Sequence, residues 1–328
     1  MRELEHDAPL INCRFDPGGK YVFATSEDRS VIRWTLDSET GDKVLLKKHD
    51  SWVRGIAFSP DGKTLVTSGF DDTLIWWPVT AAEPKPIREV KAHQGWIRTI
   101  SVSPDGKLLA SAGNDKIVKL WNFSDGKPIR QMTGHELSVY STAFDPSGKF
   151  LLSGDLKGVV HQWDIKTGKS VRTFDAKALT SYNTGQKVNY GGVRSLAFSP
   201  DGKHLACAGL HKASNPLGAI NEPLVLRFDW NNQALLKSHV TDKVRGVAWR
   251  ALFHPTENLL IGCSGGSGGG YLLFWNSEAD GTFHKFKLKD TARECDLHSD
   301  GIQIATTHHD RKLRICRMQS EPNTGSAG

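Results

Sequence analysis

Short stretches of alternating apolar and polar residues recur along the whole chain. Residues 97–121 show the pattern most clearly: an alternating stretch, a Ser-Pro-Asp-Gly turn, a second apolar stretch, a second turn, and a third stretch that ends at Trp121. Alternation over such short lengths, bounded by turn residues, is typical of β-strands. One unit of three short strands cannot bury its apolar faces alone, so we expect it to be part of a repeated structure.

The same unit occurs seven times. Its turn proline, or the equivalent residue, lies at Pro17, Pro60, Pro104, Pro146, Pro200, Pro255 and Ser299. The steps between these positions are 42 to 44 residues, with two longer steps of 54 and 55. A period of this length is typical of propellers and other repeat folds, and it indicates one domain rather than the two that the length suggests.

A fourth strand precedes the histidine that opens the next unit, as in the residues before His49, His93, His135 and His239. Residues 1–6 have the same pattern, although no unit precedes them, and the last unit has only three strands of its own. We therefore predict that the N-terminal strand completes the last unit. Joining the two ends removes the open sheet edges that would otherwise invite aggregation.

Several motifs give the repeats a resemblance to a known family. The sequence SPDGK begins at Ser59, Ser103 and Ser199, a Gly-His pair lies at 134–135, and Trp-Asp lies at 163–164. In these motifs and their repetition the chain resembles the WD-repeat family of β-propellers. The resemblance implies an all-β fold: a closed seven-bladed β-propeller with four antiparallel strands per blade, the N-terminal strand completing the last blade. It implies a single propeller domain over residues 1–317, and we expect residues 318–328, which are polar and small, to form a disordered tail.

The resemblance also implies a buried hydrogen-bond network in each regular blade, in which an aspartate in the turn pairs with the blade's histidine, and the histidine meets a hydroxyl and the tryptophan. The matching sets are His49, Thr67, Asp71 and Trp77 in blade 2, and His93, Ser111, Asp115 and Trp121 in blade 3. The corresponding aspartates of blades 1 and 7 are Asp28 and Asp310. Because the set recurs from blade to blade, we interpret it as structural and not as a catalytic triad.

The second half of the chain departs from this pattern. Lys157 stands at the aspartate position in blade 4, His211 in blade 5, and a glycine tract at 264–270 in blade 6, which leaves the network in doubt in these blades. Insertions at 176–192 and 210–223, together with the glycine tract, are predicted to gather on one face over blades 5 and 6. They either bind a ligand or are neutral additions. Blade 6 is also read as inserting residues 250–252 between its first strand and the turn proline.

Composition excludes few functions. The net charge is +6 and no apolar run approaches the roughly 20 residues of a membrane helix. The five cysteines include no Cys-x-x-Cys pair and lie beside apolar residues, so we expect buried thiols in a reducing compartment, and the cytoplasm as location. No spacing of histidines and carboxylates sets three metal ligands on one face, so we predict no metal and no cofactor.

The strongest candidate site is the second residue of each first strand, which in a propeller lies at the mouth of the central channel. Aligned, these residues are Ile11, Arg54, Arg98, Tyr140, Arg194, Arg245 and Arg293. Five guanidinium groups around one opening favour an anionic guest, unless they are merely solvated or paired with neighbouring carboxylates. Trp52, Phe70 and Trp96 are predicted to lie beside them, and Trp, Tyr and Arg often anchor protein interfaces. The alternative for the two tryptophans is packing against their own blades.

Three functions follow as hypotheses. The first is a non-catalytic scaffold that binds a protein partner, through an acidic peptide, on the face around the channel. The second is a nucleic-acid or anionic-ligand binding module that uses the same arginines, although the lysines of the turns lie on the opposite face. The third is a propeller enzyme such as a hydrolase or lyase, which lacks support because no nucleophile motif, unrepeated acid–base pair or metal signature is present.

Overall fold

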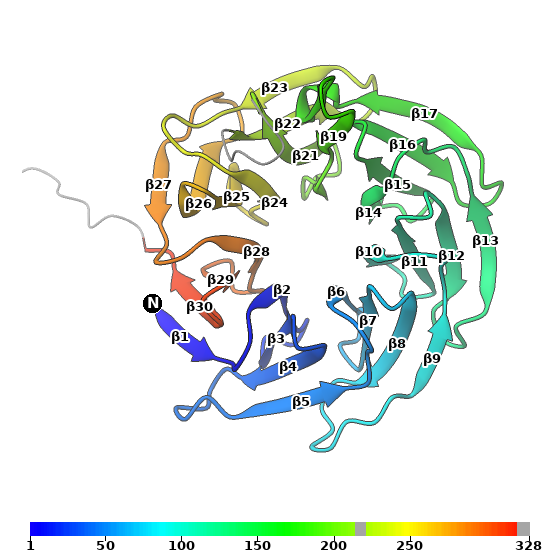
Figure 1. Ribbon diagram of the computed structural model, residues 1–328, viewed down its shortest axis with the longest axis vertical. Helices are drawn as coiled ribbons and strands as arrows, with labels where there is room; N and C mark the ends of the chain where they lie inside the picture. Colours follow the sequence, from blue (N-terminus) through cyan, green and yellow to red (C-terminus); the bar gives the residue numbers. More distant parts are fainter. Residues whose placement is uncertain (214–220, 320–328) are drawn as a thin grey trace, which may run out of the picture.

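The fold is a ring of β-sheets. The computed structural model describes residues 1–213 and 221–319, and these residues form seven four-stranded antiparallel sheets and one two-stranded sheet. Figure 1 shows the seven sheets around a central channel, with the first strand of each sheet nearest the channel and the last strand at the outer rim. The predicted all-β, seven-bladed propeller is confirmed.

The first four blades follow each other along the chain. Blade 1 contains β2 (Leu10–Phe15), β3 (Tyr21–Ser26), β4 (Ser30–Thr35) and β5 (Lys43–Lys47). Blade 2 contains β6 (Val53–Phe58), β7 (Thr64–Gly69), β8 (Thr73–Pro78) and β9 (Arg88–Lys91). Blade 3 contains β10 (Ile97–Val102), β11 (Leu108–Gly113), β12 (Val118–Asn122) and β13 (Pro128–Met132). Blade 4 contains β14 (Val139–Phe144), β15 (Phe150–Asp155), β16 (Val159–Asp164) and β17 (Ser170–Asp175).

Two of the remaining blades, 5 and 6, carry longer hairpins. Blade 5 contains β20 (Ser195–Phe198), β21 (His204–His211), β22 (Glu222–Asp229) and β23 (Leu235–His239). Blade 6 contains β24 (Val247–Phe253), β25 (Leu259–Gly266), β26 (Gly269–Asn276) and β27 (His284–Lys287). Blade 7 contains β28 (Ala292–Leu297), β29 (Gln303–His308), β30 (Lys312–Arg317) and, from the start of the chain, β1 (Arg2–Glu5). A short helix, η1 (Lys177–Leu179), and the hairpin β18 (Thr180–Asn183) and β19 (Val188–Gly191) precede blade 5.

The alternating pattern forms strands because each blade has neighbours on both faces. Between blades 1 and 2, for example, Phe23, Ile56 and Trp77 belong to one apolar cluster, and all three side chains are buried. Equivalent clusters lie at successive junctions around the ring. The core of the protein is therefore a chain of contacts between adjacent blades, which explains why one repeat cannot fold alone.

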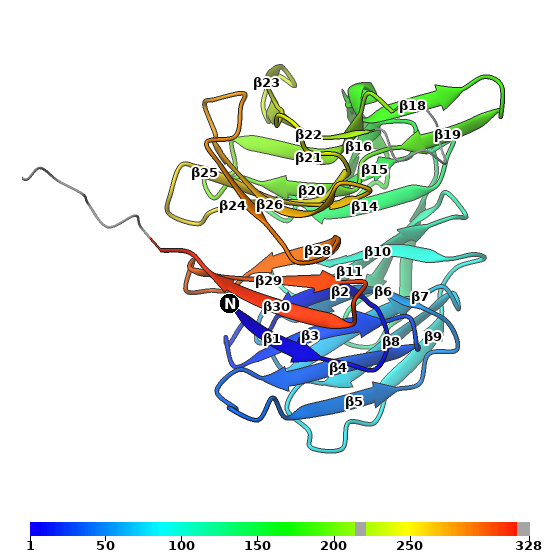
Figure 2. The same ribbon diagram turned by 60° about the vertical axis from the view of Figure 1, so that its left-hand side comes forward.

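The ring closes through the first strand, as predicted. β1 pairs antiparallel with β30, so that Leu4 lies opposite Leu313 and both side chains are buried. Figures 1 and 2 show β1 beside β30 in both views. This pairing completes blade 7 with residues from opposite ends of the described chain.

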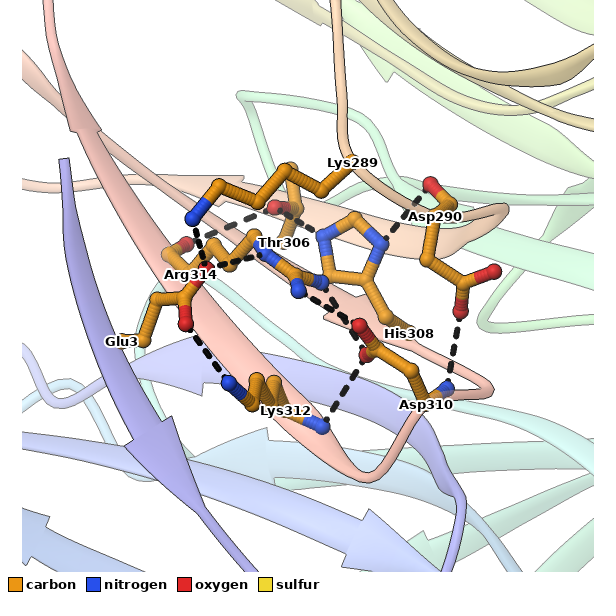
Figure 3. A network of polar contacts seen from close by, with 8 residues as sticks. All are labelled: Glu3, Lys289, Asp290, Thr306, His308, Asp310, Lys312 and Arg314. Carbon is orange, nitrogen blue, oxygen red and sulfur yellow. Dashed lines mark hydrogen bonds and ion pairs between the residues drawn. The ribbon is translucent and has the colours of Figure 1, made fainter.

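A cluster of charges supports this closure, as Figure 3 shows. The Glu3 carboxylate accepts hydrogen bonds from Lys312 Nζ at 2.7 Å, Lys289 Nζ at 2.9 Å and Arg314 Nε at 3.0 Å. The hydrogen bonds from Lys312 and Lys289 lower the pKa of Glu3 to about 2. The carboxylate thus joins the first strand to both the third strand of blade 7 and the segment that enters the blade.

The predicted network is confirmed in the regular blades. In blade 2, His49 Nδ1 lies 2.8 Å from Asp71, His49 Nε2 lies 2.8 Å from Thr67 Oγ1, and Trp77 Nε1 donates to the same hydroxyl at 2.9 Å. The same contacts join His93, Asp115, Ser111 and Trp121 in blade 3. Burial acts to raise the pKa of Asp71, but the hydrogen bond and charge of His49 outweigh it and hold that pKa below its usual value.

Blade 4 also has the network, although the sequence pattern left it in doubt there. Asp155, two residues before Lys157, places Oδ2 2.8 Å from His135 Nδ1. His135 Nε2 lies 2.6 Å from Ser153 Oγ, which also accepts from Trp163 Nε1 at 2.7 Å. The aspartate is contributed by the end of β15 and not by the turn, because its side chain reaches the histidine from either position.

Blades 5 and 6 lack the full network, in line with the sequence pattern. In blade 6, Gly262 occupies the hydroxyl position, so Trp275 Nε1 donates to Val240 O and His239 Nδ1 lies 2.7 Å from Ala279 O. In blade 5, His211 lies 3.4 Å from Glu222 on the opposing strand. These blades depend on longer hairpins and apolar packing instead.

Blades 1 and 7 use modified networks. His6 Nε2 in blade 1 lies 2.9 Å from Asp28, the predicted aspartate. In blade 7 the predicted Asp310 pairs with Arg314, while His308 comes from β29 itself and its Nε2 lies 2.8 Å from Thr306 Oγ1 (Figure 3). The place of the blade's histidine is thus filled by a residue of the strand and not of the connecting segment.

The long loops lie together on one face, as predicted. Tyr190 OH, from the β18–β19 hairpin, donates to Ala213 O at 3.2 Å, and Gly246 N donates to Asn221 O at 3.0 Å. Figure 2 shows the hairpin projecting from the ring. Residues 214–220 of the second loop lie outside the described residues. The insertion expected at 250–252 is wrong: these residues are part of β24, and the additional residues precede the strand.

The cysteine prediction is confirmed, since all five are buried thiols without a disulfide. Within the described residues, no helix is long and apolar enough to cross a membrane. Met318 N still donates to Ile302 O at 2.9 Å, at the edge of blade 7. Most of the predicted tail, residues 320–328, lies outside the described residues.

Candidate functional site

The channel mouth is built by one equivalent position in every first strand. In six blades, the pairing between the first and second strands shifts register at this residue, so that the strand has a β-bulge there. In blade 5 the equivalent residue lies immediately before β20. A bulge bends the strand and redirects a side chain. The residues at this position are Ile11, Arg54, Arg98, Tyr140, Arg194, Trp249 and Arg293, and all seven line one cavity of about 310 Å³.

One predicted member of the ring is wrong. The residue of blade 6 at the mouth is Trp249 and not Arg245, because the register shift in β24 lies between Ala248 and Arg250. Arg245 is exposed and precedes the strand. A sequence signal was available: the ring residue lies six positions before the turn proline or its equivalent in every blade, as Trp249 does before Pro255. The mouth therefore has four arginines instead of five.

The central part of the mouth alternates guanidinium groups with aromatic rings. Arg98 Cζ lies 4.5 Å from the centre of the Tyr140 ring, and Arg194 Cζ lies 4.0 Å from the same ring. Arg194 also lies 5.5 Å from the Trp249 ring. Cation–π contacts at these distances hold both arginines across blades 3 to 6.

The predicted aromatic patch adjoins this row at blades 2 and 3. The rings of Phe70 and Trp96 stack with centres 4.3 Å apart at an angle of 6°, and Trp52 stacks on Phe70 at 6.2 Å. Arg98 Cζ lies 5.4 Å from the Trp96 ring, which joins the patch to the row. Trp52 and Trp96 each remain 44% exposed, so one side of the stack is open to solvent. We call this continuous surface, from Trp52 to Trp249, the aromatic–arginine row.

Among the described residues, the arginines of the row, Arg54, Arg98 and Arg194, have no carboxylate within ion-pair distance. Arg98 Nε donates to Asn114 Oδ1 at 2.6 Å, and Arg54 Nη1 donates to Ile11 O at 3.4 Å. Arg194 Nε has no hydrogen-bond partner among the described residues. Burial lowers the pKa of Arg194 to about 10 and that of Arg54 below its usual value, yet both stay charged at neutral pH. Of the four arginines, Arg293 alone has a carboxylate partner in the part of the chain that the structure describes: Glu27, at 2.5 Å.

A second polar layer, not identified from the sequence as a unit, lies deeper in the channel. Arg250 is 3.3 Å from Asp296 and 3.8 Å from Glu294, and Arg14 is 3.7 Å from Glu294. Burial raises the pKa of both Glu294 and Asp296, against the attraction of Arg250. Each of these residues lies either one or three positions after the ring residue of its own strand. Their position deeper in the channel therefore follows from the same alignment of the first strands. Their charges offset one another, whereas those of the row above do not.

Metal ligands and catalytic triads were the two kinds of chemical site that the sequence raised. No group of three His, Cys, Asp or Glu side chains is arranged to hold a metal ion within residues 1–213 and 221–319. The His-Asp-hydroxyl sets resemble a catalytic triad in geometry, but the Thr67 side chain is fully buried and its hydroxyl is held by Trp77. No substrate can reach such a hydroxyl without unfolding of the blade.

Comparison with known proteins agrees with this architecture. The family model described as "WD domain, G-beta repeat" matches residues 1–35, 43–78, 84–122, 126–164 and 180–212, which together are more than half of the chain. The chain belongs to the WD-repeat family. The matched ranges end at residue 212, within blade 5 of this WD-repeat protein, so its blades 6 and 7 lie outside them apart from the N-terminal strand.

Similar curated proteins match only part of this WD-repeat chain. They include the nuclear distribution protein nudF of Emericella nidulans, 32% identical over 24% of this chain and 18% of its own length. Ribosome assembly protein 4 of Chaetomium thermophilum is 43% identical over 18% of this chain and 12% of its own length. Human apoptotic protease-activating factor 1 is 34% identical over 22% of this chain and 6% of its own length. The matched stretch thus spans less than a fifth of each of these relatives.

Proposed function

We propose that this WD-repeat propeller is a non-catalytic scaffold that binds an acidic segment of a partner protein at its channel mouth. The observation that carries the proposal is the aromatic–arginine row, in which Arg98 and Arg194 are fixed between aromatic rings and have no carboxylate partner within residues 1–213 and 221–319. Arginine and large aromatic residues are the side chains that most often anchor protein interfaces.

The charge balance of the mouth favours an acidic guest. Four arginines surround the opening, and Glu27 is the one carboxylate paired with them among the described residues. A partner carboxylate placed beside Arg98 and Arg194 would gain charge-assisted hydrogen bonds with guanidinium groups that the protein already holds in position. Because the row is held by its aromatic neighbours, little side-chain freedom is lost on binding.

The shape of the surface favours a peptide over nucleic acid. The open faces of Trp52 and Trp96 lie next to the charged row, so the site combines apolar contact area with positive charge over a short distance. A nucleic-acid interface would be expected to continue as a basic track along the backbone. The turn lysines, such as Lys149 and Lys203, lie at the other ends of the first strands, away from the mouth.

Two observations support a scaffold in place of an enzyme. The His-Asp-hydroxyl sets are buried and recur from blade to blade, as expected of structural elements. The names of the matched relatives refer to nuclear distribution, ribosome assembly and activation of an apoptotic protease, which supports a shared interaction module more than a shared reaction. The buried thiols support a reducing compartment, which we propose to be the cytoplasm.

The test is capture of partners from native cell extract by the wild type and by the double variant Arg98→Glu and Arg194→Glu, followed by mass spectrometry. The control is Lys149→Glu and Lys203→Glu, which changes the net charge equally on the other face. We expect proteins with acidic segments to be retained by the wild type and the control, and lost from the first variant. Equal retention by all three proteins would refute binding at the mouth. Capture of nucleic acid alone, with affinity falling steeply as salt rises, would favour the alternative function.

A further inference from the structure

Six of the seven junctions between blades are held at the outer rim by an arginine. Its guanidinium reaches across to the turn that follows the third strand of the next blade, where it donates to backbone carbonyls or pairs with a carboxylate. The pairs, in order around the ring, are Arg2 with Leu36 and Ser38, Arg33 with Val79 and Ala81, Arg88 with Ser124, Arg130 with Lys166 and Thr167, Arg172 with Trp230 and Asn231, and Arg227 with Glu278. Each arginine thus closes one gap between neighbouring blades.

These arginines occupy one structural position. Each lies in a cross-strand pair between the third and fourth strands of its blade, in some blades on the third strand and in others on the fourth, as in Arg33 opposite Val44 and Arg88 opposite Trp76. In blade 6 the corresponding pair is Phe274 opposite His284. No arginine occurs anywhere in residues 269–287, so blade 6 has no side chain of this kind to offer blade 7.

The junction of blades 6 and 7 is open where the other six are bridged. A groove of about 750 Å³ lies there, between β25 to β27 on one side and β29 and β30 on the other, and its walls include Leu259, Leu272, Phe274, Phe286, Ile304 and Met318. We call it the seam groove. Figure 1 shows β27 and β30 at the outer edge of the ring, away from the channel. The site is therefore separate from the mouth and does not depend on the proposed function.

The groove exposes aromatic surface beside an arginine. Phe283 is 67% exposed and Phe286 is 40% exposed, although both line the groove. Within residues 1–213 and 221–319 no carboxylate lines it, while Arg317 does. Arg317 pairs with no carboxylate among those residues. Large exposed aromatic side chains in a concave site mark an interaction surface.

We propose that the seam groove binds a short segment of a partner protein that carries at least two large apolar side chains flanked by aspartate or glutamate. The apolar side chains would cover Phe283 and Phe286, and an acidic residue would pair with Arg317. Residues 320–328 of the chain itself, SEPNTGSAG, follow the groove directly but contain no large apolar side chain to fill it. A membrane surface is flat and would leave a concave groove unfilled.

The test uses a random 12-residue peptide library displayed on phage, depleted on the variant Phe283→Glu and Phe286→Glu and then selected on the wild type. Labelled peptides from the selection are measured by fluorescence anisotropy. We expect enriched sequences with paired large apolar residues and flanking acids, and an affinity lower by about tenfold or more on the depletion variant, because a few large side chains at the centre of an interface carry most of its binding free energy.

Two further variants make the result specific. His284→Arg restores an arginine at the open junction, so we expect it to raise the thermal midpoint and to weaken peptide binding, which also shows that the loss is not caused by misfolding. Ile129→Glu and Val171→Glu change two equally exposed apolar residues on the outer strands of blades 3 and 4, and should leave binding unchanged.

Several results would overturn the proposal. Failure to enrich any sequence, or enrichment of apolar peptides without acidic residues, contradicts the stated chemistry. A dimer in sedimentation that is lost in the Phe283→Glu and Phe286→Glu variant would identify a second copy as the occupant. Stronger peptide binding after deletion of residues 320–328 would identify the tail as the occupant, and pelleting with anionic vesicles that needs the two phenylalanines would identify a membrane.

Discussion

The structure assigns the network aspartate of blade 4 to Asp155, and this assignment gives a sharp test of stability. Two variants in the same turn should differ strongly. Asp155→Ala removes a buried carboxylate that meets His135 Nδ1 at 2.8 Å and accepts hydrogen bonds from the backbone N–H groups of Lys157 and Val159, each at 2.9 Å. Lys157→Ala removes only a side chain that pairs with Glu136 at the surface.

The expected magnitudes follow from burial. The Asp155 side chain is 1% exposed, and breaking a buried pair by removing one partner costs about 3–5 kcal/mol because the other groups are left unpaired. Lys157 and Glu136 are 44% and 72% exposed, so their pair contributes about 0–1 kcal/mol. Since a whole domain is stable by about 5–15 kcal/mol, the first loss is a large fraction of the total and the second is not.

The variant Asp155→Asn removes the negative charge of the side chain but keeps its size and shape, so it separates the two contributions. The amide oxygen can still accept from the two backbone N–H groups, but the amide nitrogen then faces His135 Nδ1, which must give up its proton. We expect a loss between those of the two alanine variants, about 1–3 kcal/mol.

The assay is equilibrium unfolding in guanidinium chloride, followed by tryptophan fluorescence, because Trp163 donates to Ser153 within the same network. The free energies of unfolding of wild type, Asp155→Ala, Asp155→Asn and Lys157→Ala are compared at neutral pH. If Asp155→Ala were no more destabilising than Lys157→Ala, the assignment of Asp155 to the network would be refuted, together with the estimate from burial.

Two further predictions concern pH and ring closure. Burial lowers the pKa of His308 from 6.5 to about 4, so the folded protein holds it neutral while the unfolded chain takes up a proton below pH 6.5. The contribution of His308 to stability should therefore be intact above pH 6.5 and be lost as the pH falls from there through about 4. In urea unfolding at several pH values, His308→Gln should reduce the change of the free energy of unfolding with pH. Glu3→Gln removes the carboxylate that three cations share, and because Glu3 is partly exposed we expect a loss of about 1 kcal/mol and faster hydrogen exchange in β1 and β30. Glu5→Gln, an exposed residue of the same strand, should change neither, and equal exchange in the two variants would contradict the role of Glu3.

Much of the fold could be predicted because its signals are local and repeated. Each strand has its own alternation of apolar and polar residues, and each turn has its own proline, glycine or aspartate. A strand or turn that is unclear in one unit can therefore be assigned by comparison with the other six units. The networks of His49 and His93 followed from spacing within single blades. Asp155 was missed because aligning the blades looks for the aspartate at the turn position alone. In blade 4 the carboxylate reaches His135 from the end of β15 instead.

The candidate site was predictable in part. The arginines at 54, 98, 194 and 293 share a strand position, but Arg245 was placed in the ring because blade 6 has extra residues before its first strand, and only pairing with β25 shows which residue lies at the bulge. The groove between blades 6 and 7 had no sequence signal within one repeat, because the missing arginine is recognised only when the third and fourth strands of all blades are compared.

The sequence by itself determined the number of blades, the strands within them, the closure by residues 2–5 and the burial of the cysteines, because each depends on periodicity along the chain. Only the tertiary structure decided that Tyr140 lies between Arg98 and Arg194, that Glu3 meets three cations, and that one junction is left open. The second depends on how the first strand meets β30, and the other two depend on distances between blades. Such distances are set by how neighbouring sheets pack around the channel, and the sequence of a single repeat does not specify which side chains of the next blade it will contact.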